Sequence, residues 1–300
     1  MPEPQLACVI VAFHRPQSLR LLLDMLRHPG IEIIVVNVED DDEVAAVAAP
    51  AHVVVPLRGN PGYAAAVNRG VARCTAPIVA FMNDDVEADA AALLALGEVV
   101  ASGRADVCVP RVVDGDGVAE PTIASLPTPG GLLKEWALLP DRPVPALRRL
   151  GVEKWRLPQA PERVDAAAAV VVVTERELLQ SEPLPEDYFL YWEESEWFWR
   201  LRRRGAAVEY EPQVQVRHRG GRDDVRPAKS ALLARNAVRC VHRTQGRGRA
   251  ALAWLVVLLW NARLTTVDAA RSARRRDVGS GRLRARWAGM RAAAAAWREV

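Results

Sequence analysis

The sequence predicts an α/β fold in which a mostly parallel sheet carries helices on both faces, followed by a run of helices at the C-terminus. Three observations lead to this prediction. Short apolar runs, typical of strands buried on both faces, recur at residues 6–13, 31–36 and 78–82. Helical patterns separate them, as in a sheet built from strand–helix–strand units. From about Lys229 the composition turns to Ala, Leu and Arg, which favours helices.

The expected elements follow a regular order. Leucines at helical spacing come after the first strand, and Pro29-Gly30 ends that helix. A Pro- and Gly-rich stretch at 114–161 interrupts the order. The expected strands are 6–13, 31–36, 53–57, 78–82, 164–174, 208–210 and 214–216, and the expected helices include 19–26, 63–74 and 132–139. We therefore expect one domain at residues 1–228, with halves at 1–100 and 101–228, and a basic helical region at 229–300.

Composition and charge narrow the class of protein. The 300-residue chain has a formal net charge of +3, which by itself is too small to indicate a nucleic-acid partner. Its four cysteines are far apart and lack CxxC spacing, so neither a zinc site nor a disulfide framework is expected. The first strand follows without a secretion signal, and the longest apolar run, 250–260, is shorter than the roughly 20 residues of a membrane span. A cytoplasmic protein is expected.

The strongest chemical signal is the carboxylate pair Asp84-Asp85 at the end of an apolar strand. Ligands of open α/β sheets bind at this end of the strands. Mg²⁺ and Mn²⁺ prefer carboxylate oxygens together with substrate phosphates. The pattern therefore predicts a site for a divalent cation and a diphosphate, and a solvated turn is the alternative.

Two further segments and one histidine carry candidate functional groups. Residues 58–70 combine a turn with a small-residue helix start, which suits a flat ligand or a tightly packed βα turn. Residues 188–202 surround three glutamates with aromatic rings, which would desolvate a carboxylate and raise its pKa. Acidic groups at an exposed helix start are the alternative, above all for Glu196. His218 follows a short strand, where it could reach a metal or have a structural role.

In this order the four features resemble the family 2 glycosyltransferases of the GT-A fold, especially the bacterial rhamnosyl- and galactofuranosyltransferase-like branch. The resemblance covers roughly residues 6–240 and rests on Val11–Pro16, Asn60–Gly70, Asn83–Asp85, Tyr188–Glu194 and His218. It implies an enzyme that moves a sugar, with inversion, from a nucleotide-diphosphate donor to a hydroxyl acceptor. A dTDP- or UDP-sugar is the expected donor, and a glycan, a lipid-linked molecule or a small molecule is the acceptor.

The resemblance also implies a role for each matching residue. Asp85 would bind a Mg²⁺ or Mn²⁺ ion that bridges the donor diphosphate, with His218 as a further ligand. Glu194, or in second place Glu193, would be the general base that deprotonates the acceptor. The donor-binding residues would be Phe13, Arg15, Asn37, Glu39, Asn60, Gly62, Asn68 and Asp84.

Two positions depart from the family pattern. The family commonly has Val-Asp-Asn after its second strand, whereas this chain has Val36-Asn37-Val38, so Asn37, Glu39 or Asp40 would make the nucleoside contact. The usual Glu-Asp pair is Glu193-Glu194, whose second side chain is longer by about one bond. A non-catalytic nucleotide-sugar-binding partner is therefore one alternative. A nucleotidylyltransferase-like enzyme is the other, although the first turn lacks the glycine-rich loop of that class.

The last helix predicts a surface partner. Its apolar residues share one face and arginines project elsewhere, which suits the inner, anionic face of the cytoplasmic membrane. These apolar residues are Leu283, Trp287, Met290, Ala294 and Trp297. A helix packed on the protein with a solvated basic face is the alternative. No nucleic-acid-binding motif accompanies the arginines, so no nucleic-acid partner is expected.

Overall fold

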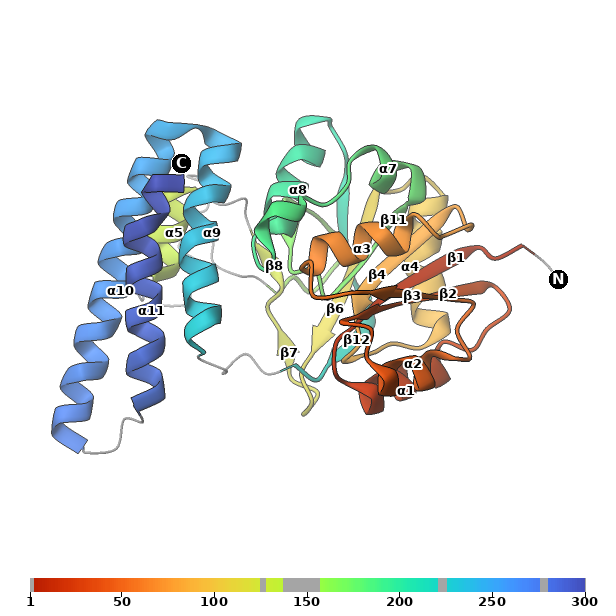
Figure 1. Cartoon of the computed structure of the whole chain (residues 1–300). Helices are drawn as coiled ribbons and strands as arrows, with labels where there is room; N and C mark the ends of the chain where they lie inside the picture. The colour runs from red at the N-terminus through yellow and green to blue at the C-terminus, as the bar shows by residue number, and fades with distance from the viewer. Residues whose placement is uncertain (1–2, 125–127, 137–156, 221–225, 276–279, 300) are drawn as a thin grey trace. The chain divides into compact units, whose positions relative to one another are not determined.

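The computed structural model describes residues 3–124, 128–136, 157–220, 226–275 and 280–299. The chain divides into two compact units (Figure 1). Unit 1 comprises residues 1–124, 155–189 and 197–221, and unit 2 comprises residues 125–154, 190–196 and 222–300. The predicted division at residue 228 stays a prediction, and the last three residues of the helix predicted at 132–139 lie outside the described residues.

Unit 1 is built on a mixed sheet whose strand order is β3-β2-β1-β4-β11-β6-β12-β5, with β7 beside β6 and β9 beside β12. The strands are β1 (Leu6–Ala12), β2 (Ile31–Val38), β3 (Val53–Leu57), β4 (Ile78–Asn83), β5 (Val86–Glu87), β6 (Val107–Val113), β7 (Ala119–Glu120), β9 (Glu162–Val164), β11 (Val171–Glu175) and β12 (Val208–His218). The strands β3, β2, β1 and β4 run parallel, and β11 is antiparallel to β4 and β6. The carboxyl ends of β1, β2 and β4 therefore lie at one edge.

Helices cover both faces of this sheet, as the sequence predicts. The helices of unit 1 are α1 (Pro16–Met25), α2 (Asp42–Ala48), α3 (Tyr63–Val71), α4 (Ala90–Ala101) and α7 (Arg176–Ser181), with a 3₁₀ turn at Glu186–Tyr188. Buried leucines and valines of α1, α2 and α4 form one core with Cys8, Ile10 and their neighbours in the sheet. On the opposite face, Gly70 of α3 meets Val9 and Val36. The predicted α/β fold class is confirmed.

Two of the strand predictions differ from the structure. The single strand expected at 164–174 is divided into β9, β10 (Ala166–Ala167) and β11. The two short strands expected at 208–210 and 214–216 form the single strand β12, which pairs in parallel with β6. The register shifts between Glu211 and Gln215, around Pro212. Proline cannot donate to the ladder and is accommodated at a bulge. The strand therefore continues to His218, at the edge that carries the ends of β4 and β5.

Unit 2 contains three long helices that lie side by side (Figure 1). They are α9 (Pro227–Gln245), α10 (Arg247–Arg275) and α11 (Ser280–Ala296), with α5 (Pro129–Trp136) beside α10 and a 3₁₀ turn at Trp297–Glu299. Their shared core consists of small and β-branched residues, and Trp192 packs against it. The helix α8 (Glu193–Arg203) begins in this unit and continues in unit 1.

The packed face of α11 is made of alanines. Ala285, Ala293 and Ala296 are fully or almost fully buried, whereas Trp287, on the face expected to be apolar, is 52% exposed. The indole of Trp254 in α10 donates to the carbonyl of Ala293, which ties the two helices together. The last helix is therefore part of the packed unit. The side chains of Arg271, Arg274, Arg275 and Arg282, and the whole of Arg276, lie outside the described residues.

The apolar helical segment is longer than the run expected at residues 250–260. Residues 247–270 are long and apolar enough, by length and composition alone, to cross a membrane. One side of the helix is nevertheless buried and carries polar contacts, because Asp268 pairs with Arg286 of α11 at 3.0 Å and Asn261 donates to Val257. We therefore interpret α10 as a helix of the packed unit.

All four cysteines, Cys8, Cys74, Cys108 and Cys240, are buried and free. Burial raises the pKa of Cys74 and of Cys108 to about 12, and it raises the pKa of Cys8 further. A thiol reacts as its thiolate, so these side chains are unreactive at neutral pH.

Candidate active site

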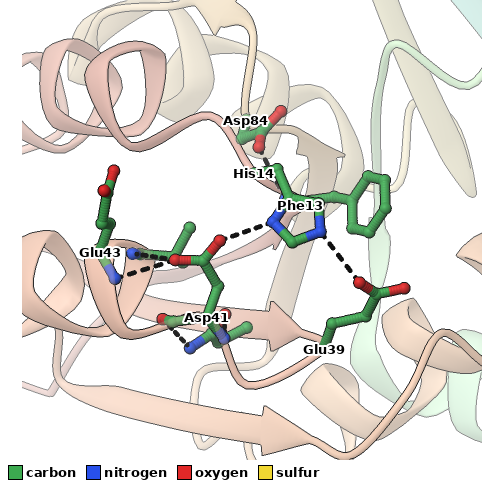
Figure 2. A network of polar contacts seen from close by, with 8 residues as sticks. Phe13, His14, Glu39, Asp41, Glu43 and Asp84 are labelled. Atoms are coloured by element: carbon green, nitrogen blue, oxygen red, sulfur yellow. Dashed lines mark hydrogen bonds and ion pairs between the residues drawn. The ribbon is translucent and has the colours of Figure 1, made fainter.

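The turn after β1 is held against the ends of two neighbouring strands. The backbone N–H of Phe13 donates to the Asp84 carboxylate at the end of β4 over 2.8 Å. Next to it, Nδ1 of His14 lies 2.6 Å from Asp41 and Nε2 lies 2.9 Å from Glu39, both in the turn after β2. Figure 2 shows the imidazole ring between these two carboxylates. The three strand ends are thus joined by polar contacts.

The His14 ring carries a proton on each nitrogen in this arrangement. Carboxylates only accept hydrogen bonds, so both ring nitrogens must donate, and the ring is an imidazolium. The bonds to Asp41 and then to Glu39 raise the pKa of His14. His14, Glu39 and Asp40 all have positive φ, at 54°, 68° and 51°. Such backbone conformations are uncommon outside glycine and gather at functional sites.

Asn37 and Asp41 build the second turn from within. Asn37 is fully buried, and its side chain makes hydrogen bonds of 2.9 and 3.1 Å to the backbone of Asp41. Asp41 also caps α2, because its carboxylate accepts from the N–H groups of Glu43 and Val44. Both polar atoms of the Asn37 amide are therefore engaged, and the exposed groups at this turn belong to His14 and Glu39.

The carboxylate pair at the end of β4 lies among positive groups. Asp85 is 5% exposed, pairs with Arg15, and its Oδ1 is 3.3 Å from Nε2 of His218. Burial would raise the pKa of Asp85, but the neighbouring His218 and Arg15 lower it below the ordinary value. Burial raises the pKa of Asp84 to about 6, against the Phe13 hydrogen bond. Asp85 is therefore the member of the pair that stays ionised to the lower pH.

These residues fit a divalent cation. Oδ1 of Asp85 is buried and, apart from its 3.3 Å contact with Nε2 of His218, has no hydrogen-bond partner within the described residues, which suits an atom that serves as a ligand. Gly220 keeps the space beside it open, because a Cβ there would lie 2.7 Å from Nε2 of His218 and 2.8 Å from Oδ2 of Asp85. No group of three His, Cys, Asp or Glu side chains is placed to hold a metal within the described ranges. Asp85 and His218 would share the ion with phosphate and water, as is usual for Mg²⁺.

Two predicted donor-binding residues, Asn60 and Gly62, shape the turn before α3. Asn60 accepts from the N–H of Gly62, whose φ is 94°. A Cβ on Gly62 would lie 2.7 Å from the Cα of Phe189, and the N–H of Tyr63 donates to the Phe189 carbonyl over 2.9 Å. Gly62 therefore lets the backbone of this turn approach the backbone of Phe189. This contact agrees with the alternative given for residues 58–70, a tightly packed βα turn.

Asn68 is also engaged within unit 1. Its amide donates to the carbonyl of Leu184 and to Glu186, and accepts from the N–H of Leu184. Its donor-binding role stays a prediction, while its observed contacts hold the segment that leads to the 3₁₀ turn.

The acidic pair Glu193-Glu194 begins α8. Glu193 is 4% exposed, Glu194 is partly exposed, and each has one buried oxygen without a hydrogen bond. Burial raises the pKa of both carboxyls, and the charge of Glu194 raises that of Glu193 further. The N–H groups of Glu194, Trp192 and Ser195 favour the ionised form of Glu194. Burial and the neighbouring charge thus favour the protonated form of Glu193, while the backbone N–H groups favour the ionised form of Glu194.

The alternative considered for Glu196, an acidic side chain at an exposed helix start, does not hold. Glu196 is 4% exposed and pairs with Arg243 of α9 at 2.8 Å. Its charge is therefore balanced within unit 2, whereas no ion pair joins Glu193 or Glu194 to another of the described residues.

Comparison with known proteins gives one family. Residues 7–146 match the model of glycosyl transferase family 2. The matched segment is somewhat less than half of the 300-residue chain. No curated protein matches the sequence.

Several solved structures resemble this chain in fold. GalNAc-T7, solved with UDP, GalNAc and Mn²⁺, has a TM-score of 0.56 and 16% identity over 80% of this chain, which spans 48% of the length of GalNAc-T7. TarS 1-349 from S. aureus, in complex with UDP, has a TM-score of 0.54 and 12% identity, covering 98% of this chain and 90% of its own. The mannosyltransferase PcManGT from Pyrobaculum calidifontis, in complex with GDP-Man and Mn²⁺, has a TM-score of 0.55 and 14% identity, covering 99% and 87%. They confirm the expected GT-A fold.

Sequence reasoning missed several residues of the candidate site. His14, Asp41 and Gly220 were not singled out, although one signal was available. A histidine follows one parallel strand and an acidic run follows its neighbour, so opposite charges were bound to meet at the shared edge. Gly220 gave no such signal, because its role depends on the path of β12.

Proposed function

We propose that the protein is an inverting glycosyltransferase that moves a sugar from a nucleotide-diphosphate donor to a hydroxyl acceptor. The observation that supports this most is the end of β4, where a buried charged Asp85 meets Arg15 and His218 within a family 2 domain. Mg²⁺ or Mn²⁺ would be held by Asp85 and His218, and when bound it would neutralise charge on the departing diphosphate. Arg15 adds a positive charge next to the same carboxylate.

The acceptor chemistry falls to the acidic pair of unit 2. Glu194 takes the proton of the acceptor hydroxyl while the acceptor oxygen forms its bond to the anomeric carbon of the donor sugar. The bond from that carbon to the diphosphate oxygen breaks on the opposite side, so the configuration inverts. Glu193 stays protonated, which limits the pair to one negative charge. A base with a raised pKa accepts a proton more readily near neutral pH.

The donor and acceptor classes follow from the sequence motifs. A dTDP- or UDP-sugar is the proposed donor, with dTDP-rhamnose and UDP-galactofuranose as the first to test, because the motif order is similar to that branch. The acceptor is a glycan, a lipid-linked molecule or a small molecule with a free hydroxyl. The bound nucleotides of the related structures, UDP and GDP, make GDP-mannose a necessary comparison.

The proposal is tested by nucleoside diphosphate release. The full chain is incubated with dTDP-, UDP- and GDP-sugars, with MnCl₂ or MgCl₂ and with EDTA. Metal-dependent release of dTDP or UDP is expected from at least one donor. Release of pyrophosphate from a sugar phosphate and a nucleoside triphosphate would indicate a nucleotidylyltransferase. Metal-dependent binding of the same sugars without turnover would indicate a non-catalytic partner.

The C-terminal helices carry a surface suited to the anionic inner face of the cytoplasmic membrane. Leu252, Leu255 and Leu259 of α10 are 58%, 46% and 60% exposed and recur at helical spacing. Exposed Arg249 and Arg263 lie on the same helix, before and after these leucines. Apolar side chains flanked by arginines bind an anionic interface through both burial and charge. The proposed membrane surface is therefore on α10, which shifts it from the last helix, where the sequence had indicated it.

Liposome binding tests this surface. The triple substitution Leu252→Gln, Leu255→Gln and Leu259→Gln should reduce co-sedimentation with phosphatidylglycerol vesicles by more than about tenfold, since a buried leucine contributes about 1.5–3 kcal/mol. Leu21→Gln, at an exposed leucine of α1, is the matched control and should bind normally. Equal binding by the triple variant and the wild type would eliminate this surface.

A further inference from the structure

The segment that precedes the acidic pair has a strained backbone. Phe189, Tyr191 and Trp192 have φ values of 67°, 69° and 78°, and none of them is glycine. A bulky residue at positive φ costs on the order of 1–3 kcal/mol and persists only where its surroundings hold it. Three such residues in four positions require a specific restraint, and they end where Glu193 begins α8.

Helix α9 supplies that restraint through Asn236. This residue is fully buried, and its Nδ2 donates to two successive carbonyls, those of Leu190 at 2.9 Å and Tyr191 at 3.1 Å. A side-chain amide with two N–H groups suits two adjacent acceptors. An unpaired buried carbonyl is costly, so these bonds favour the observed conformation over its alternatives.

The same helix holds the other side of the pair. Arg243 lies seven residues after Asn236, hence on the same face of α9, and its Nε is 2.8 Å from Glu196. Between the two contacts, Trp192 packs against Ala234, Ala237 and neighbouring apolar residues of unit 2. The segment 190–196, with Glu193 and Glu194 in it, is thus fixed at both ends by one helix.

We infer that Asn236, together with Arg243, positions the Glu193-Glu194 pair for proton transfer. Both are positioning residues, because they contact the backbone and Glu196 and not the reacting atoms. The inference rests on the proposed role of Glu194 as the base. The inference gives α9, which lies almost entirely in the predicted basic helical region, a role in positioning the catalytic pair. A base misplaced by about 1 Å can lose about 10²-fold in rate.

The first test compares two buried asparagines of unit 2. Asn236→Ala removes both donors, whereas Asn261→Ala removes a buried asparagine whose hydrogen bond within the described residues is to Val257 of its own helix. In Asn236→Ala, kcat for nucleoside diphosphate release from the donor that the wild type uses should fall by about 10²-fold. The Kd for UDP or GDP with MnCl₂ should stay within about twofold of the wild type. Asn261→Ala should keep a near-normal kcat.

A pH profile separates positioning from general stability. If the pair relaxes into solvent in Asn236→Ala, the pKa of its carboxyls falls toward the ordinary value, so the acid limb of the rate profile should move to lower pH. The limb should be unmoved in Asn261→Ala. An unchanged profile with an unchanged kcat in Asn236→Ala would overturn the inference, as would equal losses in the two variants.

A second pair of variants covers the case in which Asn236→Ala does not fold. Arg243→Gln removes the contact with Glu196, and Arg20→Gln, at an exposed arginine of α1, is its control. Only Arg243→Gln should lower kcat and shift the acid limb, and normal values for both would contradict the inference. The Glu194→Gln variant distinguishes a failure of the base assignment from a failure of the positioning role. If it retains activity, the base assignment fails, and if it is inactive while the Asn236 and Arg243 variants are normal, only the positioning role fails.

Discussion

The acidic pair gives the sharpest prediction, because its two members differ by environment alone. Glu194→Gln keeps the shape of the side chain and removes its ability to take a proton. Transfer should fall by about 10²–10⁴-fold, the usual contribution of a general base. At about 1.36 kcal/mol for each factor of ten, this corresponds to about 2.7–5.4 kcal/mol in the activation free energy. Nucleotide affinity with metal should barely change, since the base acts on the acceptor.

Glu193→Gln should behave differently. Because burial and the charge of Glu194 raise the pKa of Glu193, its carboxyl is the protonated one, and glutamine resembles that neutral form. Most of the transfer rate should survive. Steady-state kinetics and nucleotide titration of both variants test these expectations. Loss of activity in Glu193→Gln with activity kept in Glu194→Gln would refute the assignment of the base.

Glu193→Gln should also change how the stability of the protein depends on pH. A carboxyl whose pKa is raised in the folded state binds its proton more tightly there than in the unfolded chain. Its contribution to the free energy of unfolding is complete below the ordinary carboxyl pKa and is lost as pH rises through the raised value. Between about pH 5 and about pH 8, Tm should therefore fall less in Glu193→Gln than in the wild type. An identical pH dependence of Tm would show that Glu193 is not the protonated member.

Three further predictions concern the edge of the sheet in unit 1. Asp85→Ala should abolish turnover and remove the difference between nucleotide affinities with and without MnCl₂, and titration calorimetry that still shows this difference would count against it. His218→Ala should weaken Mn²⁺-dependent nucleotide binding and leave part of the activity, whereas unchanged values would make His218 structural. The turn held by His14 should loosen as pH rises through the raised pKa of its ring, since the bonds to Asp41 and Glu39 require the imidazolium. Nucleotide affinity should therefore decline between about pH 6 and about pH 9 in the wild type and be lower and flatter in His14→Ala; parallel curves would exclude this role.

The strands and their polar ends could be predicted because their signals are local. The apolar runs at β1, β2 and β4 and the aspartates after β4 are visible in short windows of sequence. Parallel pairing then places the carboxyl ends together without further information. The fold class and the position of Asp84 and Asp85 follow from this alone.

The remaining contacts could not be predicted, because they join distant segments through backbone geometry. The hydrogen bond from Asn236 to Leu190 joins residues that are 46 positions apart in the sequence. It also depends on three non-glycine residues at positive φ, which no composition rule suggests. The packed face of α11 could not be predicted for another reason. Hydrophobic patterning gives weight to Leu and Trp, whereas closely packed helices select small side chains such as Ala285 and Ala293 at their contact.

The burial of every cysteine has a practical consequence for labelling. The four thiols of the native chain are shielded from solvent, so the folded protein should be inert to maleimide and iodoacetamide reagents at neutral pH. Leu259→Cys would then carry a single addressable thiol on α10 without removal of any native cysteine. An environment-sensitive fluorophore attached there would report directly on whether this side of the helix enters a lipid phase. The same dye at Val118→Cys, an exposed site in unit 1, would serve as the internal reference.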